Sequence, residues 1–203
     1  MNSKRLILIA SVLMLTIGAN AQHEVGSVTF QPKMGMNIAT FTDDDDADPR
    51  LAFVTGAEFE YQVTKQLSLS AGMLYSQQGA KGKASIDNYA PLEITIKTNY
   101  INIPILANVY VAKGLALKLG VQPALNVESG FSMSVSGGRA DGSLSDVGID
   151  IKTFDLAIPL GVSYEYRNAV FEGRYNLGVT NIYDIGNSKH SVFQFTLGYK
   201  VEL

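Results

Sequence analysis

The most constraining feature of the sequence is an alternation of apolar and polar side chains that begins near Val28 and recurs to the C-terminus. In the last segment every second residue from Phe193 to Leu203 is apolar, and the residues between them are Gln194, Thr196, Gly198, Lys200 and Glu202. A period of two places successive side chains on opposite faces of a β-strand, whereas a helix requires a period near 3.6. The chain is therefore predicted to be all-β.

Eight segments carry this alternation, and each reaches the roughly 9 to 11 residues that a tilted membrane-spanning strand needs. The predicted strands are 28–41, 51–63, 67–79, 98–111, 115–128, 152–166, 169–181 and 190–203. Tight turns at 64–66, 112–114 and 167–168 alternate with long loops at 42–50, 80–97, 129–151 and 182–189. Short periplasmic turns, longer extracellular loops and two periplasmic termini are typical of outer-membrane barrels. We expect an eight-stranded antiparallel up-and-down transmembrane β-barrel.

The direction of the apolar face decides between a membrane barrel and a soluble barrel, because a soluble barrel alternates with its apolar side inward. No Lys, Arg, Asp or Glu lies on the apolar face of any predicted strand, and one such charge would cost ~2–4 kcal/mol at mid-membrane. Aromatic residues lie on this face near the strand ends, as in the two girdles of membrane barrels; they are Tyr61, Tyr164, Tyr166 and Tyr199 at the periplasmic side and Phe53, Tyr75, Phe154 and Phe193 at the outer side. The apolar face is predicted to contact lipid.

Two irregularities interrupt the pattern. Prolines fall within four strands, where each removes a backbone donor and is expected to mark a bulge or a rim; they are Pro32, Pro104, Pro123 and Pro159. Ile94 and Ile96 are also out of phase with Ile101, which predicts a bulge or an extension above the membrane between them.

The N-terminus has the form of a secretory signal. Lys4 and Arg5 precede the 12-residue apolar run 6–17, and Ala19 and Ala21 form an A-x-A cleavage site. The run is shorter than the roughly 20 residues of a transmembrane helix. We therefore expect residues 1–21 to be a cleaved signal peptide and residues 22–203 to be the outer-membrane barrel domain.

Charge and cysteine content exclude several classes. The net charge of -3 gives no basic field for nucleic acid. The absence of cysteine excludes disulfides, thiolate metal sites and an N-terminal lipid on cysteine.

Four segments of the chain carry a family resemblance: PKMGMNIATF, NYINIPILANVYV, GRYNLGVTNI and FQFTLGYKVEL. On these segments the chain resembles the PorT-like outer-membrane barrels common in Bacteroidetes, a porin-like family. The tail 196–203 is similar to the C-terminal signal by which the barrel-assembly machinery recognises such proteins. Asn102 stands where a Glu is common, and Leu203 stands where an aromatic residue is usual. The resemblance implies an outer-membrane location and, through the family's namesake, a role in secretion of surface proteins.

Three polar motifs are candidates for functional sites. The acidic run 43–46, followed by Asp48, offers oxygen ligands for Ca²⁺, but its spacing matches no EF-hand and favours a solvated loop, with a cation bridge to lipopolysaccharide as the alternative. The stretch 139–146 is interpreted as a hydrophilic loop tip. His190 lies near Ser188, Ser191 and Asp184, whereas His23 follows the cleavage site; no Gly-x-Ser-x-Gly elbow or metal-ligand spacing accompanies either histidine. We therefore expect no catalytic, cofactor-binding or metal-binding residues, and no cofactor.

The polar face predicts the contents of the barrel, since eight strands enclose a bore that side chains nearly fill. Its middle is expected to hold Lys33, Glu58, Lys118, Glu172 and Arg174, with Gln31, Asn37, Gln122 and Asn176 between them. Pairing of these charges would plug the barrel. The favoured function is a structural or interaction role at the cell surface, with lipopolysaccharide, outer-membrane lipid or secretion-system proteins as partners; the alternative is a small porin, and an outer-membrane enzyme is less favoured.

Overall fold

The computed structural model describes residues 23–42, 48–86, 90–135, 138–147, 151–182 and 188–203. The predicted signal peptide and the acidic run 43–46 lie outside these residues. Within them the strands are β1 (Val28–Phe41), β2 (Asp48–Gln62), β3 (Leu67–Ile86), β4 (Ala90–Asn102), β5 (Ile105–Ala112), β6 (Leu115–Val135), β7 (Gly138–Ser143), β8 (Phe154–Tyr166), β9 (Ala169–Gly178), β10 (His190–Tyr199) and β11 (Val201–Glu202), with a 3-10 turn η1 (Ser145–Val147) after β7. The described residues contain no helix that is long and apolar enough to cross a membrane.

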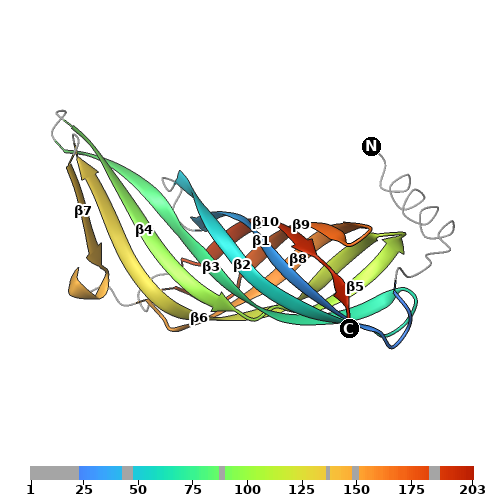
Figure 1. Cartoon of the computed structure of the whole chain (residues 1–203). Helices are drawn as coiled ribbons and strands as arrows, with labels where there is room; N and C mark the ends of the chain where they lie inside the picture. The colour runs from blue at the N-terminus through green and yellow to red at the C-terminus, as the bar shows by residue number, and fades with distance from the viewer. Residues whose placement is uncertain (1–22, 43–47, 87–89, 136–137, 148–150, 183–187) are drawn as a thin grey trace, which may run out of the picture.

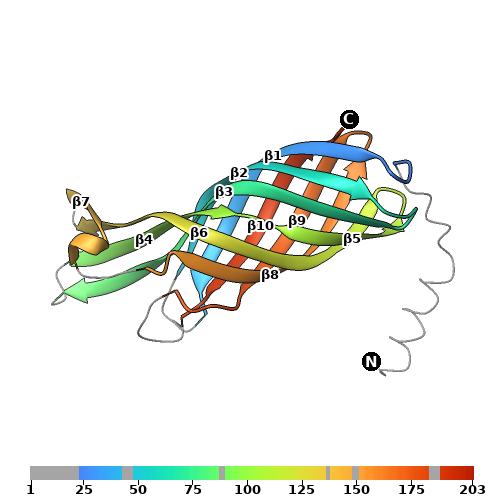
Figure 2. The same cartoon turned by 90° about the horizontal axis from the view of Figure 1, so that it is seen from below.

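The strands form one antiparallel sheet that closes on itself (Figures 1 and 2). Closure occurs between the first and last long strands, where Lys33 lies opposite Gly198 and Phe41 opposite His190. β4 and β5 share one position in the ring, β11 continues the edge of β10 against β1, and β7 pairs with β6 alone. The ring therefore has eight positions, which confirms the predicted up-and-down barrel.

The polar face points into the barrel. Lys33 is 4% exposed and its neighbour Met34 is 59% exposed, and this contrast repeats around the ring. A soluble barrel would show the opposite, so the lipid-facing prediction is confirmed. The aromatic residues predicted for the two girdles are exposed, except for Tyr75, which is half-buried.

The two ends of the barrel differ. At one end, called the terminal end, short connections join β2 to β3, β5 to β6 and β8 to β9, and His23 and Leu203 lie nearby. At the other end, called the hairpin end, β3, β4, β6 and β7 run far beyond the remaining strands (Figure 1). The projecting part, called the arm, comprises the described residues 80–86, 90–97, 130–135 and 138–143.

The arm corrects two predictions, because segments 80–97 and 129–151 were expected to be loops. Instead β3 and β4 stay paired up to Ile86 opposite Ala90, and β6 folds back on β7 with Val135 opposite Gly138. The expected loop tip at 139–146 is therefore mostly the edge strand β7. The alternation continues in the arm, but with its apolar side reversed.

The reversal occurs beside a β-bulge. Asn99 pairs with Glu128 and Tyr100 pairs with Asn126, so Val127 is an extra residue in β6. Ile94 and Ile96 lie on the same side of β4 as the buried Tyr100, whereas Ile101 faces outward. The bulge predicted between these isoleucines is confirmed, and β4 continues past it beyond the remaining strands (Figure 1).

The prolines behave differently from the prediction. Pro104 separates β4 from β5. Pro32, Pro123 and Pro159 remain inside strands whose register is unshifted on both sides of each proline. The expectation of a bulge or rim is therefore wrong for these three, and the barrel tolerates the loss of a single donor at each.

Candidate functional site

The middle of the barrel is filled by a network of ion pairs, called the central cluster. It brings together the five charged residues predicted for the lumen, which come from β1, β2, β6 and β9: Lys33, Glu58, Lys118, Glu172 and Arg174. None of these side chains is more than 3% exposed. The alternation places each of them inward, and closure of the ring brings the strands within reach of one another.

The two carboxylates of the central cluster are shared among three cations. Lys33 Nζ lies 2.8 Å from Glu58 Oε2 and 3.1 Å from Glu172 Oε2. Lys118 Nζ lies 2.7 Å from Glu172 Oε2, and Arg174 Nη2 lies 2.9 Å from Glu58 Oε1 and also contacts Glu172. Such shared pairing offsets the desolvation of buried charges, which is large for any single ion.

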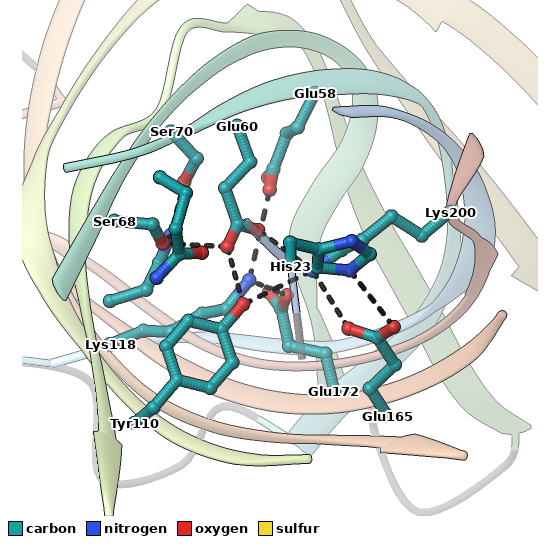
Figure 3. A network of polar contacts seen from close by, with 12 residues as sticks. His23, Glu58, Glu60, Ser68, Ser70, Tyr110, Lys118, Glu165, Glu172 and Lys200 are labelled. Carbon is teal, nitrogen blue, oxygen red and sulfur yellow. Dashed lines mark hydrogen bonds and ion pairs between the residues drawn. The ribbon is translucent and has the colours of Figure 1, made fainter. Parts of the chain in front are cut away.

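A second network, called the terminal cluster, lies toward the terminal end (Figure 3). Lys200 Nζ lies 3.1 Å from Glu60 Oε2 and 3.0 Å from Glu165 Oε2. Glu60 Oε1 also accepts hydrogen bonds from Tyr110 at 2.5 Å and Ser68 at 2.6 Å. His23 Nε2 lies 3.1 Å from Glu165 Oε1, so the segment before β1 reaches into the mouth of the barrel.

The sequence did not predict the terminal cluster as a unit. Glu165 and Lys200 fall on the polar face of the alternation, so the sequence predicts that both side chains point into the barrel. The inward direction of Tyr110 could not be predicted, because apolar residues occupy both faces of β5.

The two clusters balance in charge. Their four cations, Lys33, Lys118, Arg174 and Lys200, face four carboxylates, Glu58, Glu60, Glu165 and Glu172. Two clusters without net charge, whose side chains are engaged across strands, stabilise the closed ring.

The hairpin end of the lumen is covered by an apolar cap. Buried Phe41, Ala80 and Ile182 pack together, with Ile96 and Ile151 against them. The His190 ring packs against Phe41 and Tyr100 in edge-to-face geometry, with centroids 5.5 and 5.1 Å apart. The lumen is thus closed by apolar contacts at this end and by ion pairs at its middle.

The histidine site weighed from the sequence does not form a catalytic arrangement in the described residues. His190 is buried rather than in a loop, and neither ring nitrogen has a hydrogen-bond partner. Among the described carboxylates, that of Asp155 lies 3.9 Å away and accepts a hydrogen bond from Thr180. Ser191 shares its hydrogen bond with Tyr175 instead. Asp184 lies outside the described residues.

The described residues also contain no group of three or more His, Cys, Asp or Glu side chains placed to hold a metal ion. Of the acidic motif weighed for Ca²⁺, only Asp48 is described, and it begins β2 opposite Lys81.

Comparisons with known proteins agree with this geometry. In its overall fold the chain is similar to Neisserial surface protein A, NspA, with a TM-score of 0.51 and 14% identity over 86% of this chain and 97% of that one. It is also similar to Ail, the attachment invasion locus protein of Yersinia pestis, with a TM-score of 0.49 and 12% identity over 88% of this chain and 100% of that one. No curated protein matches the chain. At these identities the likeness to NspA concerns the fold alone.

A family model described as an outer membrane protein beta-barrel domain matches residues 20–184, which is most of the chain. The protein is thus a barrel of the bacterial outer membrane, and it belongs to the outer membrane protein beta-barrel domain family.

Proposed function

We propose that this protein is a closed, non-conducting and non-enzymatic barrel with a structural or interaction role at the cell surface. The observation that carries the proposal is the contrast between a lumen filled by the central cluster and an arm that projects beyond the barrel. A filled lumen supports no transport path, whereas a long paired hairpin presents side chains to other molecules. In this proposal the barrel anchors the protein in the membrane, and the arm contacts its binding partners.

The proposal places the arm outside the cell and both termini in the periplasm. Short turns at the terminal end and long hairpins at the other end support this orientation, because bacterial barrels keep their short turns on the periplasmic side. Removal of residues 1–21 as a signal peptide, and recognition of the C-terminal strand by the barrel-assembly machinery, belong to the same proposal.

The proposed partners are lipopolysaccharide, outer-membrane lipid and proteins that export surface proteins. The secretion link follows from the PorT-like assignment, which is supported by the four sequence segments quoted above. A strain lacking the gene should secrete less surface protein, while its envelope should remain impermeable to small dyes. A leaky envelope with normal secretion would contradict the secretion link.

The alternative function is a small porin, and planar bilayers distinguish the two. The purified protein should give no stable ion conductance, because the central cluster and the apolar cap close the same path. Arg174→Ala should lower the stability of the barrel more than it raises conductance. A steady, reproducible conductance from the unmodified protein would place the porin first.

A further inference from the structure

The arm is a four-stranded sheet with two open edges. Its strand order is β3, β4, β6 and β7, and Figure 1 shows β7 as its outermost strand. Among the described strands, β7 pairs with β6 alone, and past Lys81 β3 pairs with β4 alone. Each edge therefore presents a row of backbone donors and acceptors that another strand can pair with.

The two edges differ in the features that block such pairing. Natural proteins protect free edges with lysines, prolines and bulges. The β3 edge contains Lys81 and Lys83, whereas the β7 sequence GRADGS contains neither lysine nor proline. The pairing of β7 with β6 is free of bulges, and its two charges, those of Arg139 and Asp141, cancel. The β7 edge is therefore the unprotected edge of the arm.

The two faces of β7 differ in polarity. Arg139 and Asp141 lie on the polar face of the arm together with Lys97, which contacts Asp141. Ala140 lies on the other face opposite Met133, which is 37% exposed. A strand that extends the sheet at β7 must therefore alternate in the same way, with polar residues on one face and apolar residues on the other.

A second copy of β7 meets this requirement in one register. The run Gly138–Gly142, GRADG, is symmetric about Ala140 except that its charge changes sign. In an antiparallel pair with Ala140 opposite Ala140, each Arg139 lies opposite Asp141 of the other copy. A shift of two residues would oppose like charges, and a shift of one residue would oppose polar and apolar faces.

We propose that β7 is a self-association edge, through which two copies of the chain join their arms into one continuous sheet. The proposal deepens the proposed function, because it names a partner for the arm, and it rests on the arm being the part that contacts partners. A strand of six residues forms a small interface, so the dimer is expected to be reversible.

The charges of β7 set the register of this dimer rather than its strength. In one copy, Asp141 already accepts hydrogen bonds from Ser132, Lys97 and Arg139. In the dimer, Arg139 of the second copy replaces the chain's own Arg139, and the bonds from β6 and β4 remain. The gain comes from the backbone hydrogen bonds of the edge and from the covering of Ala140 and Met133.

Disulfide formation tests the pairing directly, because the chain contains no cysteine. Opposite residues of an antiparallel pair have Cα atoms about 4.5–5.5 Å apart, which is within the reach of a disulfide. Mild oxidation of the purified full chain carrying Ala140→Cys, in detergent micelles, should therefore give a covalent dimer on a non-reducing gel.

Met133→Cys is the matched control, because Met133 is the neighbour of Ala140 on the same face, one strand behind the edge. Its two copies would lie about 10 Å further apart than those of Ala140, which a disulfide cannot span. This variant should stay monomeric. Equal dimer yields from the two variants, or no dimer from Ala140→Cys, would overturn the proposal.

Charge variants in the Ala140→Cys background test the register. Arg139→Asp places two acidic residues on each copy, and Asp141→Arg places two basic residues there, so each variant alone should give about tenfold less dimer. An equimolar mixture should restore the yield, since every acidic residue then lies opposite an arginine of the other copy. Repair within one chain cannot produce this result, and a mixture that stays monomeric would refute the register.

The same two variants show where the copies meet. Heterodimers in cells that express both variants would place the pairing in one membrane, and heterodimers formed only after two singly expressing populations are mixed would place it between cells. Heterodimers in neither case, with Ala140→Cys crosslinked to a different envelope protein, would show that the edge binds a foreign strand and refute self-association. Conductance and secretion are measured separately, so this failure leaves the closed barrel and its surface role standing.

Discussion

Glu172 holds the central cluster together, because it contacts Lys33, Lys118 and Arg174. Replacing it by Gln keeps the shape of the side chain but leaves three cations facing Glu58 alone. Loss of one partner from a buried ion pair costs about 3–5 kcal/mol.

Glu172→Gln should therefore lower the free energy of unfolding by about that amount, measured by urea titration in lipid vesicles. The matched control is Glu93→Gln, which breaks a partly exposed pair and should cost no more than about 1 kcal/mol. Equal midpoints for the two variants would show that the central cluster does not stabilise the barrel.

The Asp141 side chain joins β7 to β4 and β6 through hydrogen bonds. Hydrogen bonds from Ser132, Arg139 and Lys97 hold the pKa of its carboxyl well below the ordinary value for aspartate. A lowered pKa means that the contribution to stability is present above the ordinary aspartate pKa and is lost as pH falls through the lower folded-state value.

Hydrogen exchange should therefore show that the amides of β7 lose protection relative to those of β8 as the pH is lowered. In Asp141→Asn, the amides of β7 should be less protected at neutral pH, and most of the pH dependence should disappear. Identical pH profiles for the two proteins would contradict the role of Asp141.

The sequence largely predicts which side chains point into the lumen. It predicts only some of the contacts that these side chains make with one another. The central residues lie in the middle of clearly alternating strands, so Lys33 and Glu172 could be placed inside and near one height. Lys200 could also be placed inside, but its contact with Glu60 and Tyr110 depends on the stagger between strands around the ring. This stagger is set when all eight strands close into a barrel, so it cannot be predicted from the sequence of any one strand.

At the scale of elements, the strands within the membrane were predictable because lipid demands an unbroken apolar face. The arm was not, since the alternation in segments 80–97 and 130–143 is out of phase with the apolar face of the spanning strands, and water accepts polar side chains on the outside. The two hairpins of the arm are local, but they are joined by pairing between β4 and β6, which are distant in sequence.

The arm also sharpens the test of orientation. An epitope inserted between Gly137 and Gly138, at the β6–β7 turn, should be labelled on intact cells because the arm carries it away from the membrane. The same epitope after Lys113, in the short β5–β6 turn, should be labelled only after the outer membrane is permeabilised. The reverse pattern would invert the proposed topology.

At the scale of the whole molecule, the closed ring predicts heat-modifiable migration. Closure leaves the ring with no open edge within the bilayer, so the folded barrel should resist detergent at room temperature. Unheated protein should migrate faster on a detergent gel than boiled protein, and it should fractionate with outer membranes. Identical migration before and after boiling, or recovery in the soluble periplasmic fraction, would be incompatible with the barrel.

The bulge at Val127 affects how deeply the barrel lies in the membrane. Along β6, outward apolar residues run from Leu117 to Val127 and stop where the polar ones begin. At about 3.3 Å per residue and a tilt of about 40°, this run spans about 25 Å, the height of the apolar band in outer-membrane barrels. The hydrocarbon thickness thus sets how deeply the barrel lies in the membrane, and the paired strands of the arm then project a fixed distance from the membrane surface. In a thicker bilayer the barrel would have to tilt or the lipid to thin, and either response would change how far the strands of the arm project above the membrane surface.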